Sequence, residues 1–244
     1  MFFRGCKGAC LGMKTVILCY HKVGIESEEG RWLNCSPENL MSHANFFVRR
    51  NFNYFLPKDF SHSMTSERKS KRVCFTFDDA YVSAVQNAPP VLESVGFRGC
   101  FYAVPSLVGM SSLWDGERAR PLATWAELLR IQSAGHEVGN HTFTHPKMSQ
   151  LDYDEQLREW QLANEMLRDN GIEVQSGCFP YGDWCHDTLK SLRNSGIPVG
   201  LQLGKRPVGG EPAECLPRVL VSFSDRVPKL IYKIWVRPKL RRKR

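Results

Sequence analysis

Short apolar runs alternate along this chain with longer amphipathic stretches. The apolar runs are rich in β-branched and aromatic residues, which is typical of buried strands. They lie at residues 16–23, 52–57, 72–78, 99–105, 136–141, 176–181, 198–203 and 215–222. We expect a strand at each of these eight places.

Helical patterns fill most of the intervals between these runs. Ser36, Pro37 and Glu38 have the order of a helix start, with a capping hydroxyl, a first-turn proline and an acid. Further helices are expected within residues 80–95, 124–134, 151–170 and 186–196. The first of these should be broken into two pieces at Pro89-Pro90. Strand–helix alternation predicts a parallel sheet, and this many units in one chain predict a closed or nearly closed β/α barrel.

The pattern divides the chain into three parts. Strand-like sequence starts at MKTVILCY, so residues 1–13 are expected to be an N-terminal extension without structure. Residues 14–224 would form one barrel domain, and residues 225–244 a basic amphipathic tail. The 244-residue chain is 42% hydrophobic, which is enough for one substantial core.

Composition indicates a reduced, cytoplasmic protein. The nine cysteines are an odd number, are scattered, and include no Cys-x-x-Cys pair, so neither a disulfide framework nor a zinc knuckle is expected. No stretch approaches the ~20 apolar residues that span a bilayer. The N-terminal apolar run is short and lacks a small-residue cleavage site, so no secretory signal is expected.

The net charge of +8 belongs to the tail. Eight of the 33 basic residues lie between Lys229 and Arg244, which leaves 25, equal to the number of acidic residues. The body of the protein is therefore neutral, and no specific nucleic-acid surface is expected.

The tail itself reads as a short helix after Asp225, with Pro228 in its first turn and Pro238 beyond its end. An apolar face next to a basic cluster predicts peripheral contact with an anionic membrane, on the inner face of the cytoplasmic membrane. Two alternatives remain: the apolar face docks on the barrel, or the tail binds nucleic acid nonspecifically. That face comprises Leu230, Ile231, Ile234 and Trp235.

Two polar motifs end predicted strands. FTFDDAY places Asp78 and Asp79 side by side, and HEVGNHTFTH contains His141 and His145. Chemistry in a β/α barrel takes place where strands end. Two histidines and a carboxylate with open positions make a facial site for a divalent ion, which would also offset the repulsion between the adjacent carboxylates. Either motif alone is weak evidence for a metal site, because paired histidines often cap a helix or pack in the core.

These motifs, with FPYG at 179–182, resemble the polysaccharide deacetylase family of NodB-type carbohydrate esterases. The resemblance covers roughly residues 14–222 and implies a distorted single-domain β/α barrel. It implies that Asp78 is the general base and that Asp79, His141 and His145 hold a divalent metal, for which we expect zinc. Pro180 and Tyr181 would wall the substrate groove, with the Tyr181 backbone N–H facing the oxyanion.

The implied function is a metal-dependent hydrolase that removes an N-acetyl group from an amino sugar in a polysaccharide or a lipid-linked glycan precursor. A metal lowers the pKa of water enough to supply a nucleophile, and Asp78 would take its proton. One alternative is a deformylase of a lipid-linked amino sugar. Another is a barrel that binds glycan but has lost catalysis.

The chain departs from the common family pattern in two places. No histidine follows His186, so the usual late acid is missing, and His21 in CYHKVG is the expected general acid. This resembles the circularly permuted branch of the family; otherwise His21 caps a helix or packs in the core. Cys178 stands where many members have an arginine that pairs with the base, and Arg218 either restores that charge or forms an ordinary surface salt bridge.

Two tryptophans are candidates for stacking on sugar rings. Trp114 lies in the long loop 106–123, and Trp184 follows the PYG turn. Aromatic faces suit the C–H faces of sugars, although most aromatic side chains belong to the core.

Overall fold

The computed structural model describes residues 15–60, 70–204, 206–209 and 211–241. The expected N-terminal extension therefore lies outside the described residues. Seven parallel strands form a closed ring, in which β1 pairs with both β10 and β5. The ring runs through β1 (Thr15–Tyr20), β10 (Leu216–Leu220), β9 (Val199–Gly204), β8 (Ser176–Cys178), β7 (Glu137–Asn140), β6 (Gly99–Ala103) and β5 (Lys71–Phe77).

The ring is distorted at β5. One edge of β5 pairs with β1 over residues 72–77. The other edge is shared: β4 (Phe52–Tyr54) pairs with residues 71–73, and β6 pairs with residues 75–77. All eight predicted strands are confirmed, with β4 as a short addition outside the ring.

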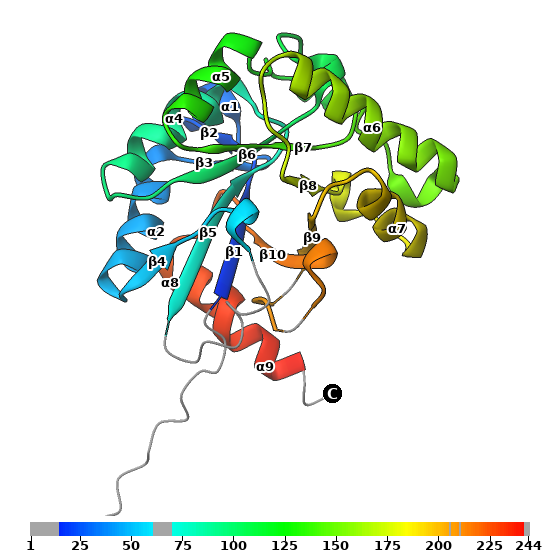
Figure 1. The fold of residues 1–244 in the computed structure, drawn as a ribbon. Coiled ribbons are helices and arrows are strands. Elements are labelled where there is room, and N and C mark those ends of the chain that lie inside the picture. The colour runs from blue at the N-terminus through cyan, green and yellow to red at the C-terminus, as the bar shows by residue number, and fades with distance from the viewer. Residues whose placement is uncertain (1–14, 61–69, 205, 210, 242–244) are drawn as a thin grey trace, which may run out of the picture.

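Helices surround the barrel, as Figure 1 shows. They are α2 (Pro37–Arg49), α4 (Val82–Glu93), α5 (Trp125–Ser133), α6 (Tyr153–Asp169) and α7 (His186–Asn194). The expected break at Pro89-Pro90 is wrong, because α4 continues through both prolines. The predicted start of α2 is confirmed, since the Ser36 hydroxyl accepts a hydrogen bond from the Asn39 N–H at 3.2 Å. A small excursion after β1 contains β2 (Lys22–Val23), α1 (Glu26–Glu29) and β3 (Asn34–Cys35).

Side chains that alternate along the strands form two separate apolar layers, one under the helices and one inside the barrel. On β5, Val73, Phe75 and Phe77 face the helices and belong to the main core. Cys74 belongs to a second cluster, made largely of strand residues, that fills the barrel. Because side chains alternate along a strand, Asp78 falls on the interior side with Cys74. Small thiols suit this narrow interior, which agrees with the positions of Cys19, Cys74, Cys100 and Cys178 on barrel strands.

The C-terminal tail is part of the folded body. It forms α8 (Val227–Ile231), a π-helical turn η7 (Tyr232–Val236) and α9 (Arg237–Arg241). Leu230 and Ile234 are completely buried, and the Trp235 ring lies 6.0 Å from Phe46. The membrane prediction is therefore wrong in one respect: the apolar face that it assigned to lipid is docked on the barrel. Deleting residues 228–244 would remove core side chains.

The tail helix also continues past Pro238, where the sequence predicted its end. A proline has no N–H for the carbonyl four residues earlier, so an ordinary α-helix is interrupted there. Here the π-helical turn shifts the backbone hydrogen bonds by one residue, and the Arg237 N–H bonds to the carbonyl of Tyr232, five residues earlier. Pro238 is buried as a result.

The tail helix runs from the rim of the barrel to its floor. Asp225 at its start follows the carboxyl end of β10, whereas the Trp235 ring lies 6.3 Å from Phe52 at the start of β4. Lys229 and Lys233 both form ion pairs with the buried Asp225 carboxylate. α9, which carries Arg237, Lys239 and Arg241, thus lies at the opposite end from the carboxyl ends of the strands (Figure 1).

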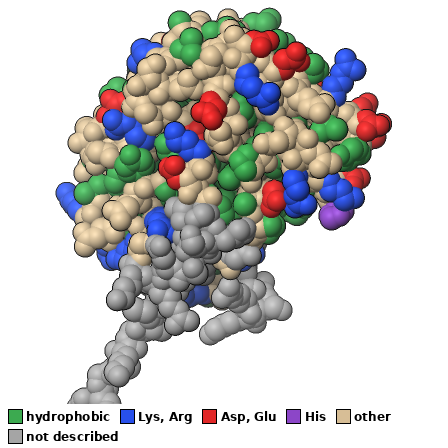
Figure 2. All heavy atoms as spheres, viewed as in Figure 1, with side chains coloured by type: hydrophobic (Ala, Val, Ile, Leu, Met, Phe, Trp, Pro, Cys, Tyr) green, Lys and Arg blue, Asp and Glu red, His purple; other side chains and the backbone are tan. Residues whose placement is uncertain are grey.

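No helix within the described ranges is long and apolar enough to span a bilayer. On the face shown in Figure 2, Lys and Arg side chains are interspersed with Asp and Glu side chains. This mixed surface agrees with the neutral charge of the body in the sequence.

One buried carboxylate lies low in the barrel. Glu137 at the start of β7 accepts hydrogen bonds from the Ser176 hydroxyl at 2.5 Å and from the Lys58 N–H at 2.9 Å. Burial nevertheless dominates and raises its pKa from 4.5 to about 7. Folding therefore favours the protonated form of Glu137.

This shift predicts a loss of stability as the pH rises. Below pH ~4.5 both the folded and unfolded states hold the proton, and between ~4.5 and ~7 only the folded state does, so the free energy of unfolding falls across that window by on the order of 3 kcal/mol. Glu137→Gln should remove this contribution to the decline. Urea unfolding at pH 5 and pH 8 measures it. Glu173→Gln, at an exposed position, is the control and should keep the wild-type pH dependence.

Candidate active site

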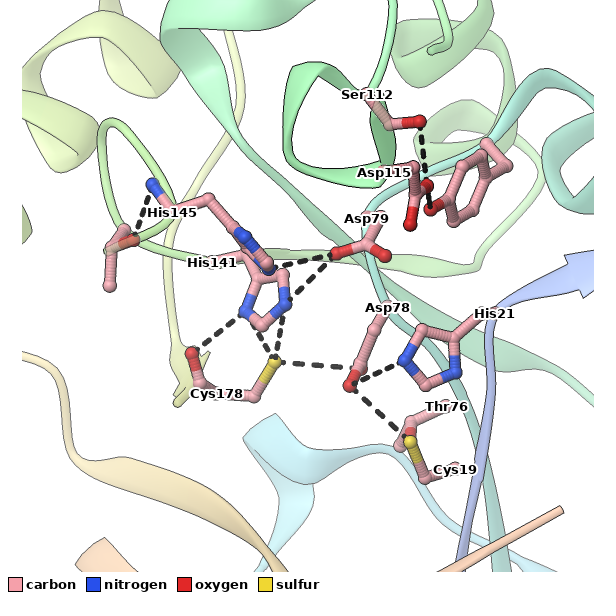
Figure 3. A network of polar contacts seen from close by, with 12 residues as sticks. Cys19, His21, Thr76, Asp78, Asp79, Ser112, Asp115, His141, His145 and Cys178 are labelled. Carbon is pink, nitrogen blue, oxygen red and sulfur yellow. Dashed lines mark hydrogen bonds and ion pairs between the residues drawn. The ribbon is translucent and has the colours of Figure 1, made fainter. Parts of the chain in front are cut away.

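The two adjacent aspartates point to different neighbours because the strand ends between them. The Asp78 N–H still bonds to the Tyr20 carbonyl at 2.9 Å, whereas Asp79 and Ala80 have φ of 69° and 49°. Consecutive residues in a strand face opposite sides. The left-handed turn instead keeps both carboxylates at the carboxyl end of the barrel (Figure 3).

Asp78 forms a buried pair with Arg218. The guanidinium binds both carboxylate oxygens, with Nη1 at 2.5 Å from Oδ1 and Nη2 at 2.8 Å from Oδ2. Arg218 is fully buried on β10, so it is not a surface salt bridge; it provides the positive charge that Cys178 cannot. Burial is the largest single influence and would raise the pKa of Asp78, but the charges of Arg218, His141 and His21, with the hydrogen bonds from Arg218, together hold that pKa well below its usual range.

Asp79 lies between two histidines. Its Oδ1 is 3.2 Å from Nε2 of His141 and 3.2 Å from Nε2 of His145, and all three residues are buried. The same oxygen makes no well-directed hydrogen bond within the described structure. Three donor atoms that converge without satisfying one another are the arrangement that a divalent cation requires, and two imidazoles with one carboxylate suit zinc.

The hydrogen bond made by His141 agrees with this interpretation. Its Nδ1 lies 2.9 Å from the Cys178 carbonyl, which can only accept, so Nδ1 is the donor. In the neutral ring, Nε2 would then carry the lone pair for a cation held beside Asp79. Two other groups of possible ligands, Cys19–His21–Asp78 and Asp78–His141–Cys178, share the Asp78 carboxylate. Both oxygens of that carboxylate are already bound to Arg218, which leaves Asp79, His141 and His145 as the candidate metal site.

A single carboxylate on α6 holds the loop between the two histidines. Glu159 accepts hydrogen bonds from the N–H groups of Phe143 and Thr144, each at 2.8 Å, and from the Thr144 hydroxyl at 2.8 Å. The loop needs support, because Thr142 and His145 have φ of 65° and 64°. Glu159 therefore fixes the spacing of the two imidazoles.

Two aromatic rings flank His145. Trp114 stacks on it with ring centroids 3.9 Å apart, and Tyr181 approaches to 4.7 Å. One face of Trp114 is thus occupied by a candidate metal ligand and is not open to a sugar. Asp115 anchors this loop by accepting hydrogen bonds from the Tyr81 hydroxyl at 2.5 Å and the Ser112 hydroxyl at 2.8 Å.

The remaining predicted residues lie around the same opening. His21 Nε2 is 4.0 Å from Asp78 Oδ2, and its Nδ1 has no hydrogen-bond partner among the described residues. Burial lowers the pKa of His21. Tyr181, with φ of 60°, is 49% exposed within the turn η5 (Pro180–Gly182). Trp184 donates from Nε1 to the Gln202 side chain at 3.1 Å and is partly exposed.

Comparison with known proteins decides the family. The polysaccharide deacetylase profile matches residues 65–200, which is more than half of the chain. The chain belongs to the polysaccharide deacetylase family. The seven-stranded parallel barrel agrees with solved deacetylases. These include IcaB from Ammonifex degensii, with a TM-score of 0.74 and 24% identity over 89% of this chain and 95% of that one.

Other relatives share less sequence. The Streptococcus pyogenes deacetylase PplD, solved with acetate, has a TM-score of 0.72 and 18% identity over 90% of this chain and 97% of that one. YxkH of Bacillus subtilis (strain 168), named as a candidate polysaccharide deacetylase, is 24% identical over 77% of this chain. A chitooligosaccharide deacetylase of Sinorhizobium fredii (strain NBRC 101917 / NGR234) is 37% identical over 28% of it. This chain spans 64% and 33% of the lengths of these two relatives.

The role of Glu159 is open to test through metal affinity. Glu159→Gln keeps the shape of the side chain but places an amide N–H₂ against loop donors, so zinc affinity should fall by about 10- to 100-fold. Competition with a chromophoric chelator measures this. Glu165→Gln, exposed on the same helix, should bind zinc as the wild type does. Unchanged affinity in a folded Glu159→Gln protein would contradict the assigned role.

Proposed function

We propose that this polysaccharide deacetylase is a metal-dependent hydrolase that removes the N-acetyl group from amino-sugar units of a glycan. The observation that carries the proposal is the convergence of Asp79, His141 and His145 beside the separately paired Asp78. One carboxylate is directed at the candidate metal site, and the other is kept free of it. Amide hydrolysis needs this division, because the base must not be consumed as a ligand.

Asp79, His141 and His145 would hold the ion, and zinc suits their donor atoms. When bound, the ion supplies water activated for attack at neutral pH and a positive charge for the acyl oxygen. Trp114 covers one side of His145 and excludes water from that flank. The backbone N–H of Tyr181, on the turn facing His145, is the proposed second stabiliser of the developing oxyanion.

Asp78 would accept the proton of the attacking water. Arg218 keeps its carboxylate ionised and fixes its orientation through two hydrogen bonds. Water oxygen bonds to the acyl carbon, and the C–N bond then breaks. The products are acetate and the free amine of the sugar.

His21 would protonate the departing nitrogen. The low pKa that burial gives His21 makes its imidazolium form a stronger acid, while the nearby Asp78 carboxylate favours that charged form. The position of this histidine at the end of β1 supports the proposed likeness to the circularly permuted branch. It reaches the site from the strand that closes the ring against β5.

The metal and base assignments are separated by two variants. Asp79→Ala should lose zinc, since the only carboxylate of the proposed ligand set is removed, and should release no amine from N-acetylglucosamine oligomers. Asp78→Asn should keep zinc and lose turnover by about 100-fold or more, because a general base contributes that much. Metal analysis and amine assays measure both, with thermal melting to confirm folding. Zinc stoichiometry unchanged in Asp79→Ala, or full activity in Asp78→Asn, would contradict the proposal.

If His21 is the general acid, the effect of removing it should depend on the leaving group of the substrate. His21→Ala should lower turnover strongly on N-acetyl sugars, whose amine leaves poorly without a proton. The loss should be much smaller on an aryl acetate, whose phenolate departs as an anion. Equal losses on the two substrates would instead indicate that His21 has a structural role.

A further inference from the structure

The tail helix is apolar on two faces. Its inner face carries Leu230 and Ile234, which are completely buried against the barrel. A second apolar set comprises Tyr232, Val236 and Leu240, and these side chains are between 42% and 57% exposed. Residues four apart share one face of a helix, and the offset of two residues places the second set on the opposite side from the first. We call Tyr232, Val236 and Leu240 the outer stripe.

Basic side chains follow the outer stripe toward the floor of the barrel. Residues 229–244 include eight basic side chains and no acidic one. The first two, Lys229 and Lys233, are paired with a buried carboxylate. Arg237 and Lys239 have no ion-pair partner within the described ranges. Positive charge is therefore left uncompensated at the lower end of the stripe.

The end of α2 extends this positive surface. The Phe46 ring lies 6.0 Å from Trp235, and the Arg50 guanidinium lies over Phe46 at 5.5 Å. Lys71, at the start of β5, donates a hydrogen bond to the Arg50 carbonyl at 2.9 Å. Arg49, Arg50 and Lys71 are all exposed. Segments far apart in the sequence thus bring basic side chains to the same end of the barrel as α9 (Figure 1).

An anionic lipid surface matches this combination of side chains. Basic residues are attracted by its negative potential, and the apolar side chains of a helix lying in the interface enter the boundary below the headgroups. Tyrosine is favoured at that boundary because its ring is apolar and its hydroxyl is polar. Nucleic acid would use the charges alone, since binding to its phosphates gains nothing from exposed Val236 and Leu240. The outer stripe therefore favours lipid over nucleic acid.

We propose that the outer stripe, with the basic side chains of α9 and the end of α2, is a docking surface for an anionic lipid membrane. It lies on a different face of the tail helix from the one that the sequence pattern assigned to lipid, so docking leaves the packing of the tail on the barrel intact. None of its residues belongs to the candidate active site. The inference is therefore independent of the proposed deacetylase function.

Vesicle binding by the full chain tests the proposal. Co-sedimentation should show at least about tenfold stronger binding to vesicles of about 30% phosphatidylglycerol in phosphatidylcholine than to phosphatidylcholine alone, and about 0.5 M salt should remove most of this difference. Arg237→Gln with Lys239→Gln should weaken binding by roughly ten- to thirtyfold, since two attractive charges are lost. Val236→Ser with Leu240→Ser should weaken it by about five- to tenfold at unchanged charge.

Two double variants away from the tail are matched controls. Arg130→Gln with Arg158→Gln removes exposed basic side chains from α5 and α6. Ile25→Ser with Leu129→Ser removes exposed apolar side chains from the end of the barrel that carries α1 and from α5. Both controls should bind the anionic vesicles as the wild type does. Thermal melting confirms that each variant is folded.

Three outcomes would overturn the proposal. The first is equal binding of the wild type to the two kinds of vesicle. The second is wild-type vesicle binding by Val236→Ser with Leu240→Ser, which would reduce the interaction to charge alone. The third is tighter binding of the wild type to duplex DNA than to the anionic vesicles at the same salt concentration, which would identify nucleic acid as the partner.

Discussion

The buried pair between Asp78 and Arg218 organises the carboxyl end of the barrel. It links β5 to β10 across the interior, and neither charge is tolerable there without the other. Such a pair adds little net stability compared with apolar packing, so its value lies in position: it fixes one carboxylate and keeps it ionised. The neighbouring thiols of Cys19 and Cys178 are small enough to leave room for it and donate to the same carboxylate.

The site is also a concentration of backbone strain. Asp79, Ala80, Thr142, His145 and Tyr181 all have positive φ without being glycine. Each such residue costs the fold on the order of 1 kcal/mol or more. The surroundings must hold these conformations in place, as Glu159 does for the histidine loop. Relaxing these conformations would recover part of that free energy but would displace the candidate ligands.

The sequence predicted what depends on local pattern. Apolar periodicity located all eight strands of the main sheet, although not the short pair β2 and β3, and the Asp and His motifs located the candidate ligands because strand ends meet at one edge of a barrel. What it left open depends on tertiary contacts. Arg218 is distant from Asp78 in sequence, and nothing local says that its side chain points inward. Glu159 looks like any acid on a helix surface. The tail was misread because an amphipathic helix has the same pattern whether its apolar face meets lipid or Phe46.

The course of the tail helix determines how the molecule can be tethered. It passes down the outside of the barrel, so a group attached near Leu240, which is 57% exposed, lies at the floor, whereas the cluster of Asp79, His141 and His145 lies at the other end. A surface or matrix that captures the protein through the basic residues of α9 would leave the candidate active site directed toward the surrounding medium. Long polymer chains could then enter without passing the support.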